Sequence, residues 1–126
     1  ENYQVTLLNG KKVKFAELRG KPLVVVFWAT SCSGCMQELP QLDKYIKEKN
    51  TFNVLAVAMN YDERTLIDNY IAKNKYPFLV THDIDNKISE QFGGIKFTPT
   101  TIVISKNGEV VTKIIGNDIN KILLNI

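Results

Sequence analysis

The feature that most constrains this chain is a pair of cysteines placed directly after a buried strand. The run Leu23–Trp28 is apolar throughout and rich in valine and aromatic residues, which predicts a strand buried on both faces. Cys32 and Cys35 follow, separated by two residues, and a helical pattern begins right after Cys32. The sequence therefore predicts that both cysteines lie where the strand turns into the first turn of a helix.

A thiol at the start of a helix is chemically activated. The unpaired N–H groups of the first turn and the helix dipole stabilise negative charge there, which lowers the pKa of a cysteine and makes it a better nucleophile. Two intervening residues let the sulfurs of Cys32 and Cys35 meet within one turn. A disulfide that closes so small a loop constrains the unfolded chain little. We therefore interpret the pair as a redox-active disulfide, with Cys32 as the nucleophile.

Two other interpretations of the cysteine pair stay open at this point. A structural zinc ion usually needs four cysteine or histidine ligands, whereas the chain contains two cysteines and one histidine, His82. Alternatively, the two cysteines are buried and inert. An isolated C-x-x-C is a moderate signal, but its place between a strand and a helix in a chain of 126 residues favours the redox interpretation.

Length and composition predict one globular domain that spans residues 1–126. The net charge of +3 is small and the lysines are scattered, so no basic surface for nucleic acid is indicated. No apolar run approaches the roughly 18 residues of a membrane span. The chain begins at Glu1 rather than methionine, which favours a processed chain whose leader or anchor preceded Glu1.

The rest of the chain predicts alternating strands and helices. Asn9-Gly10 and Asn107-Gly108 are predicted to form hairpin turns. In the expected helix 62–74, Leu66 and Ile67 should face the core. Such alternation, closed by a hairpin, predicts an α/β fold with a mixed sheet and helices on both faces. The expected strands are 4–8, 12–15, 23–28, 52–59, 78–81, 100–105 and 109–115, and the expected helices are 33–49, 62–74, 85–92 (capped by Asp85) and 118–125.

Six segments follow one another in a characteristic order: residues 18–22, residues 27–30, the C-x-x-C pair with Glu38 and Pro40, Pro77-Phe78, residues 97–101 and Asn107-Gly108. In this order they resemble the TlpA/ResA-like branch of thioredoxin-fold proteins, which are exported thiol–disulfide oxidoreductases. The resemblance covers essentially the whole chain. It implies a thioredoxin fold, with a central mixed β-sheet, helices on both faces, an N-terminal β-hairpin and a helix–strand insertion.

This resemblance implies a role for each matching residue. Cys32 is similar to the family's exposed, attacking cysteine, and Cys35 to its buried, resolving cysteine. Pro99 is similar to the cis-proline of the fold, so we predict a cis Thr98–Pro99 bond. Its loop is expected to pack against the disulfide and to offer the backbone of Thr98 to a substrate strand. Trp28 is expected to shield one side of the thiols and to contact substrate; the alternative for this residue is core packing.

Two positions depart from the family pattern. Val26 stands where thioredoxin proper carries a buried aspartate near the resolving cysteine. The resemblance to ResA-like proteins implies that an acid at the start of the inserted helix, Asp62 or Glu63, takes a comparable catalytic position. The alternative for either acid is a helix N-terminal residue favoured by the dipole. Ser31 stands where the family usually has an aromatic residue before the first cysteine.

The resemblance implies a thiol–disulfide oxidoreductase that reduces exported proteins, for example in cytochrome c maturation, and that needs no cofactor. The implied partners are protein dithiols or disulfides and an upstream electron donor in the membrane. The implied setting is periplasmic or otherwise extracytoplasmic, and the implied state is a monomer that binds no nucleic acid. Three alternative functions remain. A thiol peroxidase of the peroxiredoxin type is supported only by Thr30, and a copper chaperone of the Sco type would need a longer C-x-x-x-C spacing and a distant histidine such as His82. A plain cytosolic thioredoxin would lack the insertion at 60–77 that this chain contains.

Overall fold

One five-stranded mixed sheet organises the molecule, with the strand order β5-β4-β3-β6-β7. The computed structural model describes residues 3–126. β4 (Asn53–Ala58) pairs parallel with the central strand β3 (Leu23–Trp28), and β5 (Leu79–His82) pairs parallel with β4. On the other side of β3, β6 (Thr100–Ile104) is antiparallel, and β7 (Val110–Ile115) is antiparallel to β6. The predicted α/β fold with a mixed sheet is confirmed.

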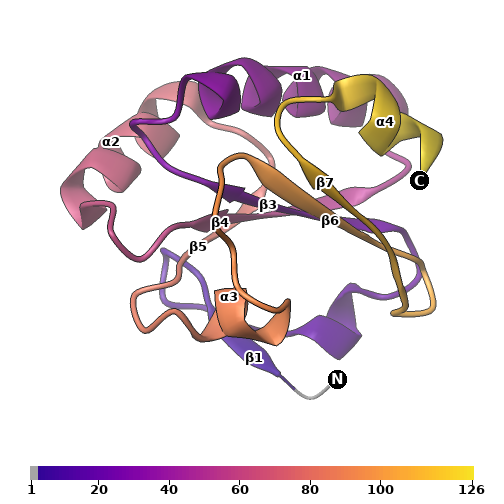
Figure 1. The fold of residues 1–126 in the computed structure, drawn as a ribbon, viewed down its shortest axis with the longest axis horizontal. Helices are drawn as coiled ribbons and strands as arrows, with labels where there is room; N and C mark the ends of the chain where they lie inside the picture. The colour runs from indigo at the N-terminus through magenta and orange to yellow at the C-terminus, as the bar shows by residue number, and fades with distance from the viewer. Residues whose placement is uncertain (1–2) are drawn as a thin grey trace.

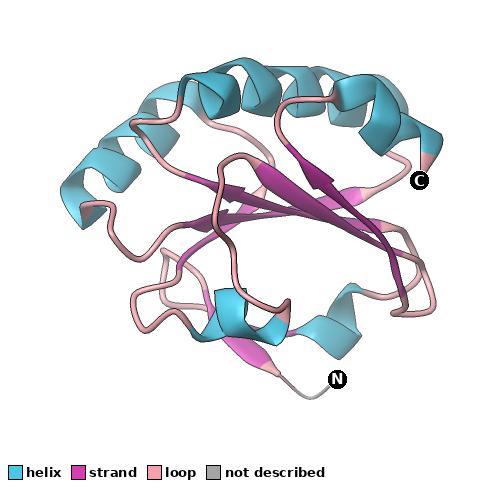
Figure 2. Cartoon of the chain, in the orientation of Figure 1, coloured by secondary structure: helices cyan, strands magenta, loops and turns pink. Residues whose placement is uncertain are grey.

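Helices cover both faces of this sheet, as Figures 1 and 2 show. One face carries α1 (Ser33–Lys49), α2 (Arg64–Asn74) and the C-terminal α4 (Ile119–Leu124). The opposite face carries α3 (Lys87–Gln91) and the N-terminal segment. That segment consists of the antiparallel hairpin β1 (Gln4–Thr6) and β2 (Lys12–Lys14) and the 3-10 turn η1 (Phe15–Leu18). Within the described residues, no helix combines the length and apolarity needed to cross a membrane.

The central strand explains why the sheet has a core on each face. All six residues of β3 are buried, and successive side chains of a strand point to opposite faces. Val26 and Trp28 therefore pack on the α1 side, whereas Val25 and Phe27 pack on the hairpin side. Burying such a side chain stabilises a fold by about 1.5–3 kcal/mol, so an uninterrupted apolar run is what this position requires.

Two local predictions, one in α2 and one in α3, differ from the structure. Leu66 was expected to face inward but is 47% exposed, whereas its neighbour Ile67 is fully buried. Adjacent helical residues are rotated by about 100° from one another, so both cannot face the sheet. At α3, the predicted cap Asp85 accepts only the Lys87 N–H, at 3.2 Å.

The main cap of α3 is Asp83, which the sequence did not single out. This aspartate is buried, and its two carboxylate oxygens accept the N–H groups of Ile88 and Ser89 and the Ser89 hydroxyl, each at 2.9 Å. Asp83 directly follows β5, so its hydrogen bonds to Ile88 and Ser89 link the end of that strand to the first turn of α3.

The N-terminal segment is fastened to the outer border of β5. The Leu8 N–H donates to the Val80 carbonyl at 2.9 Å, and Leu7 and Thr81 form an antiparallel bridge. The Thr81 hydroxyl donates to the Thr6 carbonyl at 2.6 Å. These contacts occupy the border of the sheet on that side.

Candidate active site

Cys32 and Cys35 form a disulfide at the junction of β3 and α1, with their Cα atoms 5.2 Å apart. Cys32 is the N-cap residue of α1 and is half-buried, whereas Cys35 is fully buried in the first turn. The predicted placement of the pair, between a strand and the first turn of a helix, is therefore confirmed. Cys32 Sγ, the outer sulfur of the pair, is therefore the one that a large partner can reach.

The outer sulfur already interacts with the start of the helix. Cys32 Sγ accepts the N–H of Cys35 at 3.1 Å, and the Cys32 carbonyl accepts the N–H of Met36 at 3.1 Å. When the disulfide opens, the same N–H group and the helix dipole stabilise a thiolate at Cys32. Such stabilisation lowers the pKa of a cysteine and activates it as a nucleophile.

The loop before β6 packs directly on the thiol turn. The Thr98–Pro99 peptide bond is cis, as predicted, and the Pro99 carbonyl accepts the Gly116 N–H at 2.8 Å. Gly34, between the two cysteines, lies so close that a Cβ atom there would be 3.1 Å from Cδ of Pro99. The absence of a side chain at Gly34 therefore lets the proline approach the disulfide.

A buried acid, Glu38, lies one helical turn after Cys35 and on the same face of α1. Its Oε2 accepts the Thr101 hydroxyl at 3.3 Å, and its Oε1 accepts the Asp118 N–H at 3.4 Å. Burial raises the pKa of the Glu38 carboxyl to about 7, even though both hydrogen bonds act to lower it. This group therefore exchanges a proton near neutral pH.

From the sequence, Glu38 counted only as part of a family motif and had no role of its own. The helical spacing could have indicated its burial, because Glu38 lies on the same face of α1 as Cys35, Leu39 and Leu42, all of which are fully buried. Val26 stands where thioredoxin proper has a buried aspartate; it is buried here and pairs with Thr101 of β6. Glu38 of α1 accepts a hydrogen bond from that same Thr101, so it places a carboxyl next to the position where thioredoxin has its aspartate.

The two acids predicted beside Cys35 lie in other surroundings. Asp62 is half-buried, and its hydrogen bonds go to the loop before Cys32, where it accepts the Thr30 N–H at 2.7 Å and the Thr30 hydroxyl at 2.8 Å. Glu63 is exposed and is the N-cap residue of α2, without a side-chain capping bond. Glu38, by contrast, shares a face of α1 with Cys35.

Trp28 is part of the core beneath the thiol turn. It is fully buried, belongs to the same apolar cluster as both cysteines, and packs on Tyr70 with ring centroids 5.3 Å apart. Its full burial favours core packing, the alternative to direct contact with substrate. Pro99 is likewise buried, and Thr98 is half-buried.

His82 is the last residue of β5, one residue beyond the predicted strand 78–81, and it is more enclosed than a surface residue. The residue is half-buried, and both ring nitrogens are buried without a hydrogen-bond partner. Among the residues that the structure describes, no group of three or more histidine, cysteine, aspartate or glutamate side chains is close enough to hold a metal ion.

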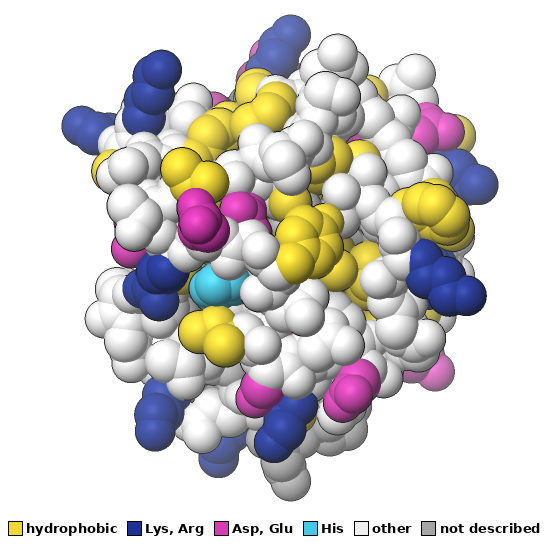
Figure 3. Space-filling model, turned by 60° about the vertical axis from the view of Figure 1, so that its left-hand side comes forward, with side chains coloured by type: hydrophobic (Ala, Val, Ile, Leu, Met, Phe, Trp, Pro, Cys, Tyr) yellow, Lys and Arg dark blue, Asp and Glu magenta, His cyan; other side chains and the backbone are white. Residues whose placement is uncertain are grey.

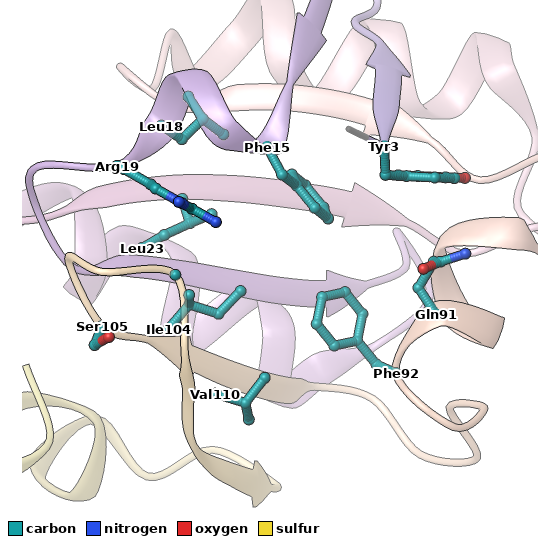
Figure 4. Close-up of a pocket in the computed structure, with 11 residues that line it drawn as sticks. Tyr3, Phe15, Leu18, Arg19, Leu23, Gln91, Phe92, Ile104, Ser105 and Val110 are labelled. Atoms are coloured by element: carbon teal, nitrogen blue, oxygen red, sulfur yellow. The ribbon is translucent and has the colours of Figure 1, made fainter. Parts of the chain in front are cut away.

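A separate cavity of about 160 Å³ lies on the hairpin side of the sheet. Figure 4 shows its aromatic walls, Phe15 and Phe92, with Tyr3 and Arg19 around them. The rings of Phe15 and Phe92 are 6.2 Å apart between centroids. Because this cavity is on the opposite face from α1, it belongs to the packing of the N-terminal segment and α3 rather than to the disulfide.

Large apolar side chains are exposed at the edge of the sheet where β3, β4 and β5 end. Tyr61 follows β4 and is 61% exposed, Ile84 follows β5 and is 68% exposed, and Phe97 precedes β6 and is 63% exposed. Thr100 at the start of β6 pairs with Phe27 near the end of β3, so these loops share the edge that carries Cys32. Figure 3 shows hydrophobic side chains below and to the right of the histidine on this face, with acidic side chains above it and a basic one to its left.

Comparison with known sequences finds a family model and several relatives. The Redoxin family model matches residues 3–125. Over 116 residues the chain is 33% identical to thiol-disulfide oxidoreductase ResA of Bacillus anthracis and 28% identical to ResA of Bacillus subtilis (strain 168). Each alignment covers 91% of this chain but only 66% and 64% of the two relatives, so the chain spans slightly less than two thirds of their length.

Solved structures agree with the fold. A Neisseria meningitidis protein determined in solution is 34% identical, with a TM-score of 0.86 over 97% of this chain and 83% of that chain. The pneumococcal exposed lipoprotein thioredoxin Etrx1 of Streptococcus pneumoniae strain TIGR4 is 25% identical, with a TM-score of 0.82 over 98% of this chain and 96% of that chain. The thioredoxin fold expected from the sequence is confirmed.

Proposed function

Because the chain belongs to the Redoxin family and to its TlpA/ResA-like branch, we propose that it is a thiol–disulfide oxidoreductase that reduces disulfides in other proteins. One observation carries the proposal. The reachable sulfur of the Cys32–Cys35 disulfide caps a helix, and the buried Cys35 shares a helical face with a carboxyl whose pKa is about 7. This arrangement supplies a nucleophile, a resolving thiol and a proton acceptor.

Reduction of a partner begins from the dithiol form. The Cys32 thiolate attacks one sulfur of the partner's disulfide, the partner's S–S bond breaks, and its second sulfur leaves as a thiolate that takes a proton from water. Cys32 and the partner are then joined by a mixed disulfide. The helix start favours this step because it stabilises the attacking thiolate.

Cys35 completes the reaction. Its thiol gives a proton to the Glu38 carboxylate, directly or through water, and the resulting thiolate attacks Cys32 Sγ. The bond between Cys32 and the partner breaks, and the partner sulfur leaves as a thiolate that is protonated in turn. Two electrons have passed to the partner's disulfide, and the Cys32–Cys35 disulfide has formed. A dithiol donor then has to reduce it again, and a membrane protein is the donor that the family resemblance favours.

The exposed apolar side chains at the reactive edge support a protein as substrate. Tyr61, Ile84 and Phe97 lie on three loops at the edge of the sheet that carries Cys32, and exposed apolar area of this kind is typical of protein-binding surfaces. Substitution of Phe97 or Ile84 by aspartate is expected to raise KM for insulin and to leave the reaction with a small aromatic disulfide unchanged. The matched control is Leu124→Asp in α4, because Leu124 is 84% exposed and lies far from the reactive edge along the chain.

We propose an extracytoplasmic setting and a role in reducing exported proteins, with cytochrome c maturation among the candidates. The support is the kinship with ResA proteins and with an exposed lipoprotein of Streptococcus pneumoniae. We also propose that the protein acts as a monomer.

Trapping of the mixed disulfide tests the chemistry. Cys35→Ser is expected to accumulate a covalent complex with insulin that dithiothreitol releases, and Cys32→Ser is expected to form none and to reduce no disulfide. Trapping by Cys32→Ser alone would reverse the two roles. Turnover of hydrogen peroxide without reduction of insulin would instead establish the thiol peroxidase that the sequence left open.

A further inference from the structure

One carboxylate fastens the loop that leads into the reactive cysteine. Asp62 lies between β4 and α2, 32 residues along the chain from Thr30. Its Oδ2 accepts the Thr30 N–H at 2.7 Å, and its Oδ1 accepts the Thr30 hydroxyl at 2.8 Å and the Glu63 N–H at 2.9 Å. Hydrogen bonds to an ionised carboxylate are shorter and stronger than those between neutral groups. A single side chain therefore holds both polar donors of Thr30.

The sheet itself places this carboxylate. The Asp62 N–H donates to the Met59 carbonyl at 3.1 Å, and the Met59 N–H donates to the Trp28 carbonyl at 2.9 Å. Met59 directly follows β4, and Trp28 is the last residue of β3, its neighbour in the sheet. Asp62 and Thr30 thus extend from the ends of two paired strands, and their contact closes the gap between the two loops.

The fastened loop is short and ends on the reactive sulfur. Residues 29–32 join β3 to α1, and within this loop the Cys32 N–H donates to the Ala29 carbonyl at 3.1 Å. Cys32 Sγ accepts the Cys35 N–H at the start of the helix. Because Thr30 is two residues before Cys32, a shift of Thr30 moves the sulfur relative to that N–H group.

We infer that Asp62 is a positioning residue for disulfide exchange, which acts through Thr30 to hold the Cys32 sulfur over the first turn of α1. The inference rests on the proposed function. When the disulfide opens, Cys32 loses its covalent tie to Cys35, and the contact between Asp62 and Thr30 still restrains the loop. A displacement of about 1 Å at a reacting group can slow a reaction by up to about a hundredfold, so this restraint bears on the rate.

Variants at both ends of the contact separate positioning from simple stabilisation. Asp62→Ala removes every bond to Thr30, whereas Thr30→Val removes only the hydroxyl bond and Thr30→Ser keeps both. The matched control is Glu63→Gln, the adjacent exposed acid that makes no side-chain capping bond to α2. The readouts are kcat and KM for insulin reduction, the rate of Cys32 alkylation by iodoacetamide against pH in the reduced protein, and the melting temperature.

Asp62→Ala is expected to lower kcat and the alkylation rate by about tenfold with little change in KM, as a modest displacement of the reacting atom would do. Thr30→Val should lose less, and Thr30→Ser and Glu63→Gln should match the wild type. The double variant Asp62→Ala with Thr30→Val should be no slower than Asp62→Ala alone, because both changes remove the same contact.

Two results would overturn the inference. One is a lower melting temperature for Asp62→Ala with unchanged kcat and alkylation, because the contact would then stabilise the fold only. The other is an equal loss in Glu63→Gln, because the effect would then follow negative charge in general. A wild-type protein that reduces no disulfide would refute the proposed function instead, and Cys32 alkylation, which needs no protein substrate, would still decide the inference.

Discussion

Replacement of Glu38 by glutamine should change how the stability of this protein depends on pH. Burial raises the pKa of the Glu38 carboxyl from its ordinary value of 4.5 to about 7 in the folded state. Between these two values the unfolded chain releases a proton that the folded protein retains, so the free energy of unfolding falls as pH rises. At about 1.4 kcal/mol for each pH unit, the whole loss is about 3 kcal/mol. This loss of stability is complete at pH values above the pKa of Glu38 in the folded protein, and it is absent at pH values below the pKa in the unfolded chain.

The variant Glu38→Gln cannot ionise and should lack this slope. Urea unfolding of the oxidised protein at a series of pH values gives the free energy of unfolding for both proteins, and their difference removes the titration of all other groups. The wild type should lose about 3 kcal/mol relative to the variant from the acid end of the series to pH 7. Glu63→Gln is the control, because Glu63 is exposed and should leave the slope as it is.

The same substitution tests the proton transfer. If Glu38 accepts the Cys35 proton, Glu38→Gln should slow resolution of the mixed disulfide by about a hundredfold, the lower end of what general-base catalysis contributes, and should remove the rate change near pH 7. Wild-type and variant unfolding curves that stay parallel across pH would refute the raised pKa. A normal resolution rate in the variant would refute the role of Glu38 as proton acceptor.

Three further substitutions follow from the geometry. Gly34→Ala should slow insulin reduction while changing the melting temperature little, because the new methyl group crowds Pro99 at 3.1 Å and alanine favours the helix by about 1 kcal/mol. Asp83→Ala should lower the free energy of unfolding by about 3 kcal/mol in urea titration, because three buried donors of α3 lose their acceptor. Tyr70→Phe removes the 2.9 Å bond to the Tyr76 hydroxyl and should cost about 1 kcal/mol in the same assay.

Strands and helices with strong apolar patterns were predictable from the sequence. β3 and α1 begin and end where expected, because an uninterrupted apolar run and a helical stripe leave few alternatives. The cis peptide bond at Pro99 was also predicted, but only through resemblance to a family, because no local property of residues 97–101 indicates it.

The acids were harder to place, for a physical reason. A glutamate in a helix is usually exposed, and the burial of Glu38 depends on which face of α1 meets β6, a matter of tertiary packing. Asp62 was expected near Cys35 from its place in the chain, whereas its actual contacts depend on the path of the loop that carries Thr30. Local sequence shows where an acid stands along an element but not which neighbouring loop its oxygens reach.

The N-terminal segment has a consequence for self-association. Residues 7 and 8 occupy the outer border of β5 through the Leu8–Val80 hydrogen bond and the Leu7–Thr81 bridge. The other border of the sheet, β7, carries Lys113 and lies beside a register irregularity, two features that discourage strand pairing. If two molecules nevertheless joined through β7, a twofold axis would use up the free border of each. Growth of the five-stranded sheet by strand addition would therefore stop at a pair.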